Sequence, residues 1–102
     1  MRISGRHILD AFCRRHPNTR GWIENWLEVV GSAPWSRPSD VKGVFATASF
    51  LAGGVVIFNV KGNSYRLETN IVYRSGDVLV NWAGTHAAYN VRNRKRGRRS
   101  RT

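Results

Sequence analysis

The chain has 102 residues, of which 41% are hydrophobic, and a formal net charge of +11 at neutral pH. This length suits one domain with a two-layer core. No apolar run reaches the ~18 residues of a membrane-spanning helix, the N-terminus lacks an apolar signal segment, and the single cysteine, Cys13, excludes an internal disulfide and fits a reducing compartment. We therefore expect a cytoplasmic protein without a membrane partner.

The positive charge is concentrated at the C-terminal end of the chain. Seven cations lie in residues 92–102, namely Arg92, Arg94, Lys95, Arg96, Arg98, Arg99 and Arg101. A mildly basic body with a strongly basic end indicates a polyanionic partner, and nucleic acid is the first candidate. Because residues 92–102 contain no apolar side chain, we predict a disordered basic tail there, after a folded domain of residues 1–91.

The first half of the chain predicts a short strand at residues 2–3 followed by two amphipathic helices. Apolar side chains recur at helical spacing over residues 5–15, where Ser4 could supply the cap, and over residues 19–30, where Gly31 would end the helix. Residues 32–40 are expected to form a loop, followed by one helical turn at most.

The second half of the chain predicts strands. Candidate strands cover residues 45–51, 55–61, 64–73 and 77–83, and a short helix or turn follows at residues 85–91. Two helices that precede three or four antiparallel strands favour an α+β domain, with both helices packed on one face of the sheet.

The first predicted hairpin places charged residues on one face of this sheet. If residues 62–63 form a two-residue loop, Asn59 pairs with Arg66. Because side chains alternate along a strand, Lys61, Arg66 and Glu68 then share a polar face with Asn59.

The second predicted hairpin brings a histidine to the same sheet end. A turn at residues 75–76 places Thr85 opposite Arg66, so that His86 lies just past the strand end, and it places Trp82 on the apolar face. A bulge in either strand would break this register.

These residues suit RNA phosphodiester cleavage, because the RNA 2′-hydroxyl can attack the adjacent phosphate without a metal ion. Arg66 and Lys61 could stabilise the negative charge of the transition state. His86 could act as acid or base, and a neighbouring Arg66 would favour its neutral form and a base role. Tyr89 could donate a proton or stack on a base. Further candidate RNA-binding residues are Lys42, Asn59, Arg74, Arg92, Arg94, Lys95 and Arg96.

Each candidate also has a purely structural interpretation. Arg66 could pair with Glu68, Lys61 could be a solvated surface charge, and His86 could hydrogen bond to backbone at the strand end. Tyr89 could simply pack under the terminal turn. The three histidines show no metal-ligand spacing, so we expect neither a metal nor a cofactor.

Two strings, Gly-Asn-x-Tyr-Arg-Leu at residues 62–67 and Thr-His-x-x-Tyr at residues 85–89, resemble the HigB toxins of type II toxin–antitoxin systems, which belong to the RelE-like mRNA interferases. The resemblance extends over about residues 3–90. Asn90 stands where the family commonly has an aspartate. The resemblance implies a RelE-like fold, cleavage of mRNA, often on the ribosome, and a cognate helix-turn-helix antitoxin (HigA-like) that blocks the toxin.

Two other functions remain open on the same scaffold. The chain could be a non-catalytic module that binds RNA or the ribosome, or a protein that acts mainly in a repressor complex with its antitoxin. The ribonuclease predicts growth arrest on expression, relieved by substituting Arg66 or His86. The binding module predicts binding without cleavage, and the repressor predicts a soluble complex without toxicity.

Overall fold

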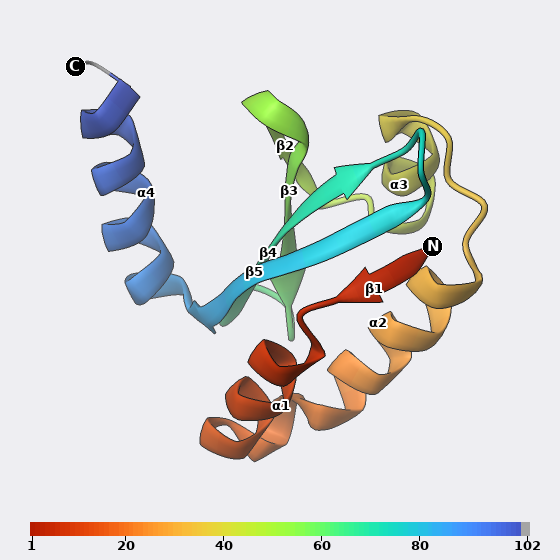
Figure 1. The fold of residues 1–102 in the computed structure, drawn as a ribbon. Coiled ribbons are helices and arrows are strands. Elements are labelled where there is room, and N and C mark those ends of the chain that lie inside the picture. The colour runs from red at the N-terminus through yellow and green to blue at the C-terminus, as the bar shows by residue number, and fades with distance from the viewer. Residues whose placement is uncertain (101–102) are drawn as a thin grey trace.

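A five-stranded sheet of order β1-β5-β4-β3-β2 forms the centre of the computed structural model, which describes residues 1–100, with side chains as far as Arg96 (Figure 1). The elements are β1 (Arg2–Ser4), α1 (Arg6–Arg15), the 3-10 turn η1 (Pro17–Thr19), α2 (Arg20–Ser32), α3 (Pro38–Val44), β2 (Ser49–Leu51), the 3-10 turn η2 (Ala52–Gly54), β3 (Val55–Val60), β4 (Tyr65–Val72), β5 (Asp77–Thr85) and α4 (His86–Ser100). No helix among the described residues is long and apolar enough to cross a bilayer.

The α+β class is confirmed, and one strand makes the sheet mixed instead of antiparallel. The N-terminal strand β1 pairs parallel with β5, from Arg2 opposite Asp77 to Ser4 opposite Leu79. The prediction was three or four antiparallel strands. The sheet has five strands, of which β2, β3, β4 and β5 pair antiparallel with one another. Strand β1 lies far from β5 in the sequence, so the local spacing of residues could not predict that these two strands pair.

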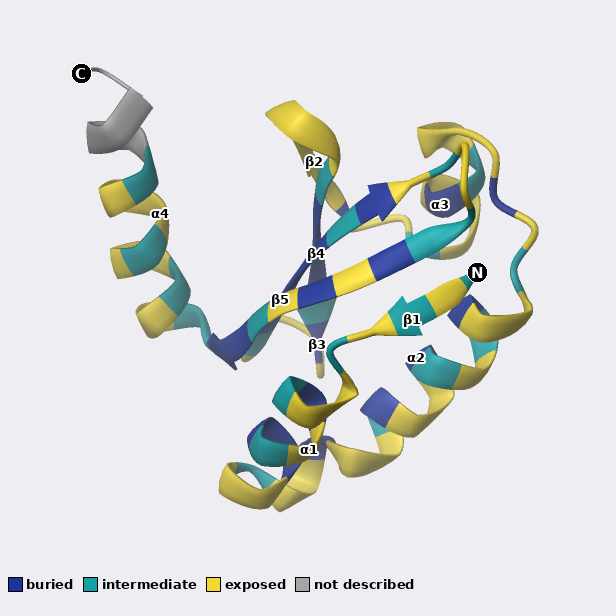
Figure 2. Ribbon diagram, viewed as in Figure 1, coloured by how far each residue is buried: buried dark blue, intermediate teal, exposed yellow. Residues whose placement is uncertain are grey.

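The core lies between one face of the sheet and helices α1 and α2 (Figure 2). Phe12 and Trp26 from the helices and Phe58 and Leu67 from the strands are almost fully buried. The rings of Trp26 and Phe58 meet edge to face, with centroids 5.5 Å apart. Burying side chains of this size contributes about 1.5–3 kcal/mol each, so this layer fixes the sheet that carries the polar residues on its other face.

Helix α1 begins at a glycine and not at the predicted Ser4 cap. Gly5 occupies the N-terminal cap position with φ +89°, and no side chain caps the helix there. A Cβ at Gly5 would lie 2.6 Å from the Val80 carbonyl oxygen. Glycine therefore allows both the left-handed backbone and the close approach of α1 to β5.

The β3–β4 hairpin has the predicted pairing with a longer turn. Asn59 lies opposite Arg66, as predicted, and Val60 opposite Tyr65 is the last ladder pair. Residues 61–64 form the turn, in which Lys61 has φ +54°. The polar face predicted for β4 is confirmed by this register.

The β4–β5 register differs from the prediction for two reasons. The connecting turn spans residues 73–76, so Val72 pairs with Asp77, and a bulge between Glu68 and Thr69 shifts the remaining pairs. Gly84 therefore lies opposite Arg66, and Thr85 lies opposite Tyr65.

The same bulge turns Trp82 away from the core. Glu68 pairs with Trp82 while Thr69 pairs with Val80, so β5 carries one extra residue, Asn81, between them. Asn81 donates a hydrogen bond to Asn70 on the outer face, and Trp82 lies on that face as well. The prediction that Trp82 belongs to the apolar face is wrong.

Helix α4 continues through the segment predicted to be a disordered tail. It begins directly after Thr85, whose Oγ1 accepts the backbone N–H of Ala88 at 3.1 Å, a typical N-terminal cap. It extends to Ser100 instead of ending near residue 91, and it leaves the end of β5 on the side opposite α1 and α2 (Figure 1). The last part of the predicted tail, residues 101–102, lies outside the described residues.

We predict that Gly5→Ala lowers the free energy of unfolding by at least about 1–2 kcal/mol, because alanine resists the left-handed backbone and would crowd Val80. Urea denaturation measures this change. Gly31→Ala in α2 is the matched control, because a Cβ there meets nothing within 4 Å, and it should leave stability unchanged or raise it. Equal effects of both substitutions would contradict the assignment.

Candidate functional site

The turn at residues 61–64 anchors both an arginine and the start of α4. Nη2 of Arg66 donates to Oδ1 of Asn63 at 2.6 Å, and its Nη1 donates to the carbonyl oxygens of Asn63 and Tyr65 at 3.3 and 3.0 Å. The backbone N–H of His86 donates to the Ser64 carbonyl oxygen at 3.0 Å. Arg66, Lys61 and the residue His86 are thus held at one end of the sheet.

Arg66 has no carboxylate partner in the part of the chain whose side chains are described. Its side chain is nearly buried, with the residue 9% exposed, and no ion pair to it is present among the described residues. Its acceptors are an amide oxygen and two backbone carbonyls, which orient the guanidinium without cancelling its charge. Such a group is suited to an anion, above all a phosphate, which arginine can bind bidentately.

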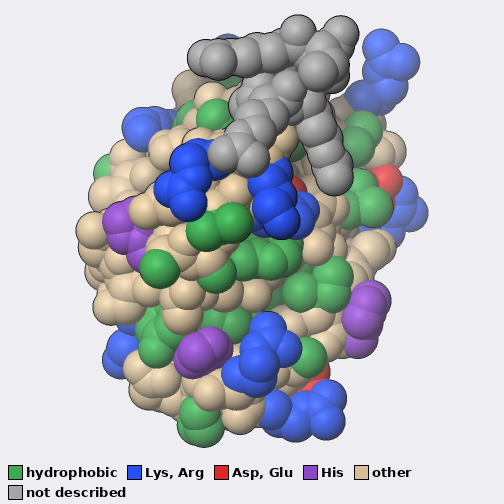
Figure 3. Space-filling view, turned by 90° about the vertical axis from the view of Figure 1, so that its left-hand side faces the viewer, with side chains coloured by type: hydrophobic (Ala, Val, Ile, Leu, Met, Phe, Trp, Pro, Cys, Tyr) green, Lys and Arg blue, Asp and Glu red, His purple; other side chains and the backbone are tan. Residues whose placement is uncertain are grey.

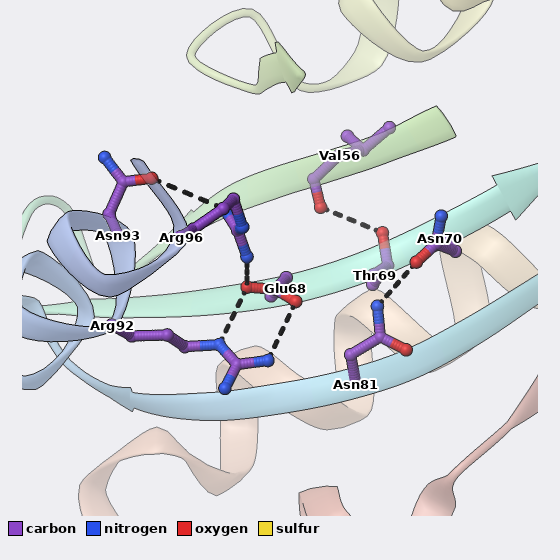
Figure 4. Close-up of polar contacts among 8 residues, drawn as sticks. All are labelled: Val56, Glu68, Thr69, Asn70, Asn81, Arg92, Asn93 and Arg96. Carbon is purple, nitrogen blue, oxygen red and sulfur yellow. Dashed lines mark hydrogen bonds and ion pairs between the residues drawn. The ribbon is translucent and has the colours of Figure 1, made fainter. Parts of the chain in front are cut away.

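Glu68, two residues along β4 on the same face, pairs with α4 and not with Arg66. Nε and Nη2 of Arg92 donate to its two carboxylate oxygens at 2.9 and 3.1 Å, and Nη2 of Arg96 donates to Oε1 (Figure 4). The Glu68 side chain is 4% exposed, whereas the two arginine side chains are 39% and 34% exposed. This Glu68 clasp, formed by Glu68, Arg92 and Arg96, holds α4 against the sheet.

The clasp favours the charged forms of Glu68 and Arg92. Burial alone would raise the pKa of Glu68, but the hydrogen bonds from Arg92 and Arg96 outweigh it and lower the pKa below the usual 4.5. The hydrogen bond to Glu68 raises the pKa of Arg92. A desolvated carboxylate with two cationic partners is stable as an ion, so at neutral pH the clasp is closed.

Trp82 connects this clasp with Arg66. Its indole lies across Gly84, where a Cβ would come within 2.7 Å of the ring, and Gly84 is the cross-strand partner of Arg66. The guanidinium carbon of Arg92 lies 5.5 Å from the centroid of the indole, and the Tyr89 ring lies 6.2 Å from it. Tyr89, a candidate catalytic residue, thus packs beside Trp82, one helical turn after His86.

The remaining residues that the sequence predicted to bind RNA lie on separate elements of the structure. Lys42 on α3 donates to the Ala48 carbonyl oxygen at 2.9 Å, and Arg74 lies in the β4–β5 turn at the opposite end of the sheet from residues 61–64. The structure does not bring these two to the candidate site. Arg94 and Lys95 are exposed on α4. Figure 3 shows the side of the molecule that carries α4, where basic side chains lie around hydrophobic ones.

Sequence reasoning missed the parts played by three residues. Asn63 was predicted as a turn former, and it also orients Arg66. Glu68 was considered as a partner of Arg66, and its partners are 24 and 28 residues further along the chain. The position of Trp82 on the outer face depends on the bulge in β5, which the sequence did not reveal. The arginines at spacing i, i+4 in residues 92 and 96 were the available signal for a helix face that binds a carboxylate.

Comparison with known protein families identifies the family of this chain. The sequence profile of the HigB toxins, described as the RelE-like toxic component of a toxin–antitoxin system, matches residues 19–91. The chain therefore belongs to the HigB toxin family, and membership implies an antitoxin partner. No curated protein matches the chain. No cluster of metal-ligating side chains is present in the described part of the chain.

We predict that Glu68→Gln lowers the free energy of unfolding by about 1–3 kcal/mol at neutral pH, less than for a fully buried pair because the arginines are partly exposed. The lowered pKa means that the folded state resists protonation of Glu68. The contribution of Glu68 is therefore complete above its usual value of 4.5 and is lost as the pH falls through the lowered folded value.

Urea denaturation of both proteins between neutrality and pH ~3 tests this dependence. The difference between wild type and Glu68→Gln should shrink toward acid pH. Asp77→Asn, which removes the exposed ion pair with Arg2, is the matched control and should have a much smaller effect. A difference that is constant with pH would contradict an ionised Glu68.

Proposed function

We propose that this protein is a metal-independent endoribonuclease that cleaves messenger RNA and thereby inhibits translation. The observation that carries the proposal is the uncompensated guanidinium of Arg66, which is oriented by Asn63 at the same turn that anchors His86. Membership of a family of RelE-like toxins supports the same activity. The expected inhibitor is a helix-turn-helix antitoxin of the HigA type.

The reaction needs only groups that these residues carry. The RNA 2′-oxygen attacks the adjacent phosphorus, His86 accepts the 2′-hydroxyl proton, and the bond from phosphorus to the 5′-oxygen breaks. Arg66 and Lys61 stabilise the additional negative charge on the phosphorane. Tyr89 donates the proton that the leaving 5′-oxygen takes up, so the products are a 2′,3′-cyclic phosphate and a free 5′-hydroxyl.

The direct test is primer extension on mRNA, with and without ribosomes, after incubation with each variant. We expect Arg66→Ala and His86→Ala each to lower the cleavage rate by about 100-fold or more and to relieve growth arrest on expression. Arg6→Gln, which removes an exposed charge on α1, is the control and should cleave like wild type. Far-UV circular dichroism confirms that each variant is folded.

The outcomes separate the competing functions. Folded Arg66→Ala that cleaves at the wild-type rate would overturn the proposal. RNA binding by wild type without any cleavage would instead indicate a non-catalytic module. An unchanged rate after His86→Ala would remove His86 from the mechanism and leave the arginine in place.

Lys61 offers a test that separates function from stability. Its φ of +54° is unfavourable for a residue with a Cβ. We expect Lys61→Gly to keep stability or raise it by up to about 1 kcal/mol, while cleavage falls by about 10-fold or more because a cation is lost. Thermal unfolding and primer extension on the same preparation measure both; unchanged cleavage would make Lys61 a purely structural turn residue.

A further inference from the structure

A groove between β5 and α4 lies beside the clasp and has no part in the cleavage steps above. It has a volume of about 360 Å³ and is lined by Trp82, Ala88, Val91, Arg92, Lys95 and Arg96. This volume is in the usual range of small-ligand sites, about 300–1,000 Å³. The indole, Ala88 and Val91 form its apolar lining, and Val91 is 44% exposed. The remaining lining residues are basic.

One wall of the groove, Trp82, belongs to the part of β5 that pairs with the strand of Arg66. Its indole lies across Gly84, directly opposite Arg66 on the neighbouring strand. Lys95 lies nine residues after His86, which is about 14 Å along a helix that rises 1.5 Å per residue. A nucleic-acid strand with stacked bases about 3.4 Å apart covers that length with about four nucleotides. A strand whose scissile linkage lies at Arg66 can therefore reach the groove.

The charge of the groove favours a polyanion. Arg92, Lys95 and Arg96 supply three cations, and Glu68 is the carboxylate bonded to them, so two positive charges remain in excess. Glu68 also fixes Arg92, whose guanidinium already lies over the indole of Trp82. Guanidinium and indole are thus arranged together before any ligand binds, which lowers the entropic cost of stacking.

We propose that this groove binds an unpaired base of the RNA strand, stacked on the Trp82–Arg92 pair, with a flanking phosphate on Lys95. Aromatic rings and arginine guanidinium planes are the usual stacking surfaces for unpaired RNA bases, and stacking beside cations is how proteins bind single strands without reading their sequence. The groove thereby extends the substrate of the proposed ribonuclease beyond the cleaved linkage, and the inference rests on that function for its RNA ligand.

The test uses a 2′-O-methyl RNA hexamer, which the proposed reaction cannot cleave, and an abasic hexamer with the same phosphates. We expect the Trp82 indole N–H resonance, assigned with Trp82→Phe, to shift on titration with the hexamer and to stay in place with the abasic oligomer. The hexamer should bind about 10-fold more tightly than the abasic oligomer. Equal affinities together with an unmoved Trp82 resonance would overturn the proposal.

Two further variants separate the base from the phosphate. Gly84→Ala forces the indole to move and should abolish the difference between the two oligomers. Lys95→Gln should keep that difference and reduce the slope of log affinity against log salt by about 1. Arg6→Gln is the matched charge control and should change neither. The opposite pattern, with base dependence lost in Lys95→Gln and kept in Gly84→Ala, would contradict the assignment.

The experiments can reject the groove and the ribonuclease activity separately. A Trp82 shift in wild type that cleaves no mRNA would retain the groove and reject the enzyme. Cleavage of mRNA by wild type without a Trp82 shift would retain the enzyme and reject the groove.

Discussion

The pairing of Glu68 with Arg92 and Arg96 is the interaction on which the outer face of the sheet depends. It places a buried carboxylate of β4 under two arginines of α4, so a helix with almost no apolar residues remains on the outer face of the sheet. It orients Arg92 beside Trp82. Because both arginines bind Glu68, the acid nearest to Arg66 along β4, this carboxylate does not neutralise the Arg66 guanidinium.

The first hairpin and the core could be predicted from sequence because both follow from local rules. The position of the turn at residues 62–63 predicted the pairing of Asn59 with Arg66, and alternation predicted the polar face that they share. The two amphipathic helices required a sheet to pack on. The register of the second hairpin could not be predicted, because Asn81 is an extra residue in β5 that the alternation of polar and apolar residues does not reveal. This one residue places Trp82 on the outer face of the sheet instead of in the core.

The start of helix α4 agrees with the short helix or turn predicted at residues 85–91, but its continuation to Ser100 could not be predicted, for a different reason. Residues 92–102 contain no apolar side chain, and this composition predicts disorder. The helix is stabilised by a partner on β4 and by the Thr85 cap. The arginines of β4 and α4 show a division by partner: Arg92 and Arg96 bind a carboxylate, while the acceptors of Arg66 among the described residues are neutral oxygens. We propose that this division separates the two structural arginines of the clasp from an arginine that binds a phosphate.

A pair of double-mutant cycles on the free energy of unfolding tests this division most directly. One cycle combines Glu68→Gln with Arg92→Gln, and the other combines Glu68→Gln with Arg66→Gln. The structure predicts a coupling of about 1–3 kcal/mol between Glu68 and Arg92 and less than about 0.5 kcal/mol between Glu68 and Arg66. A stronger coupling of Glu68 to Arg66 than to Arg92 would show that the acid neutralises the proposed phosphate-binding cation, and it would contradict the account.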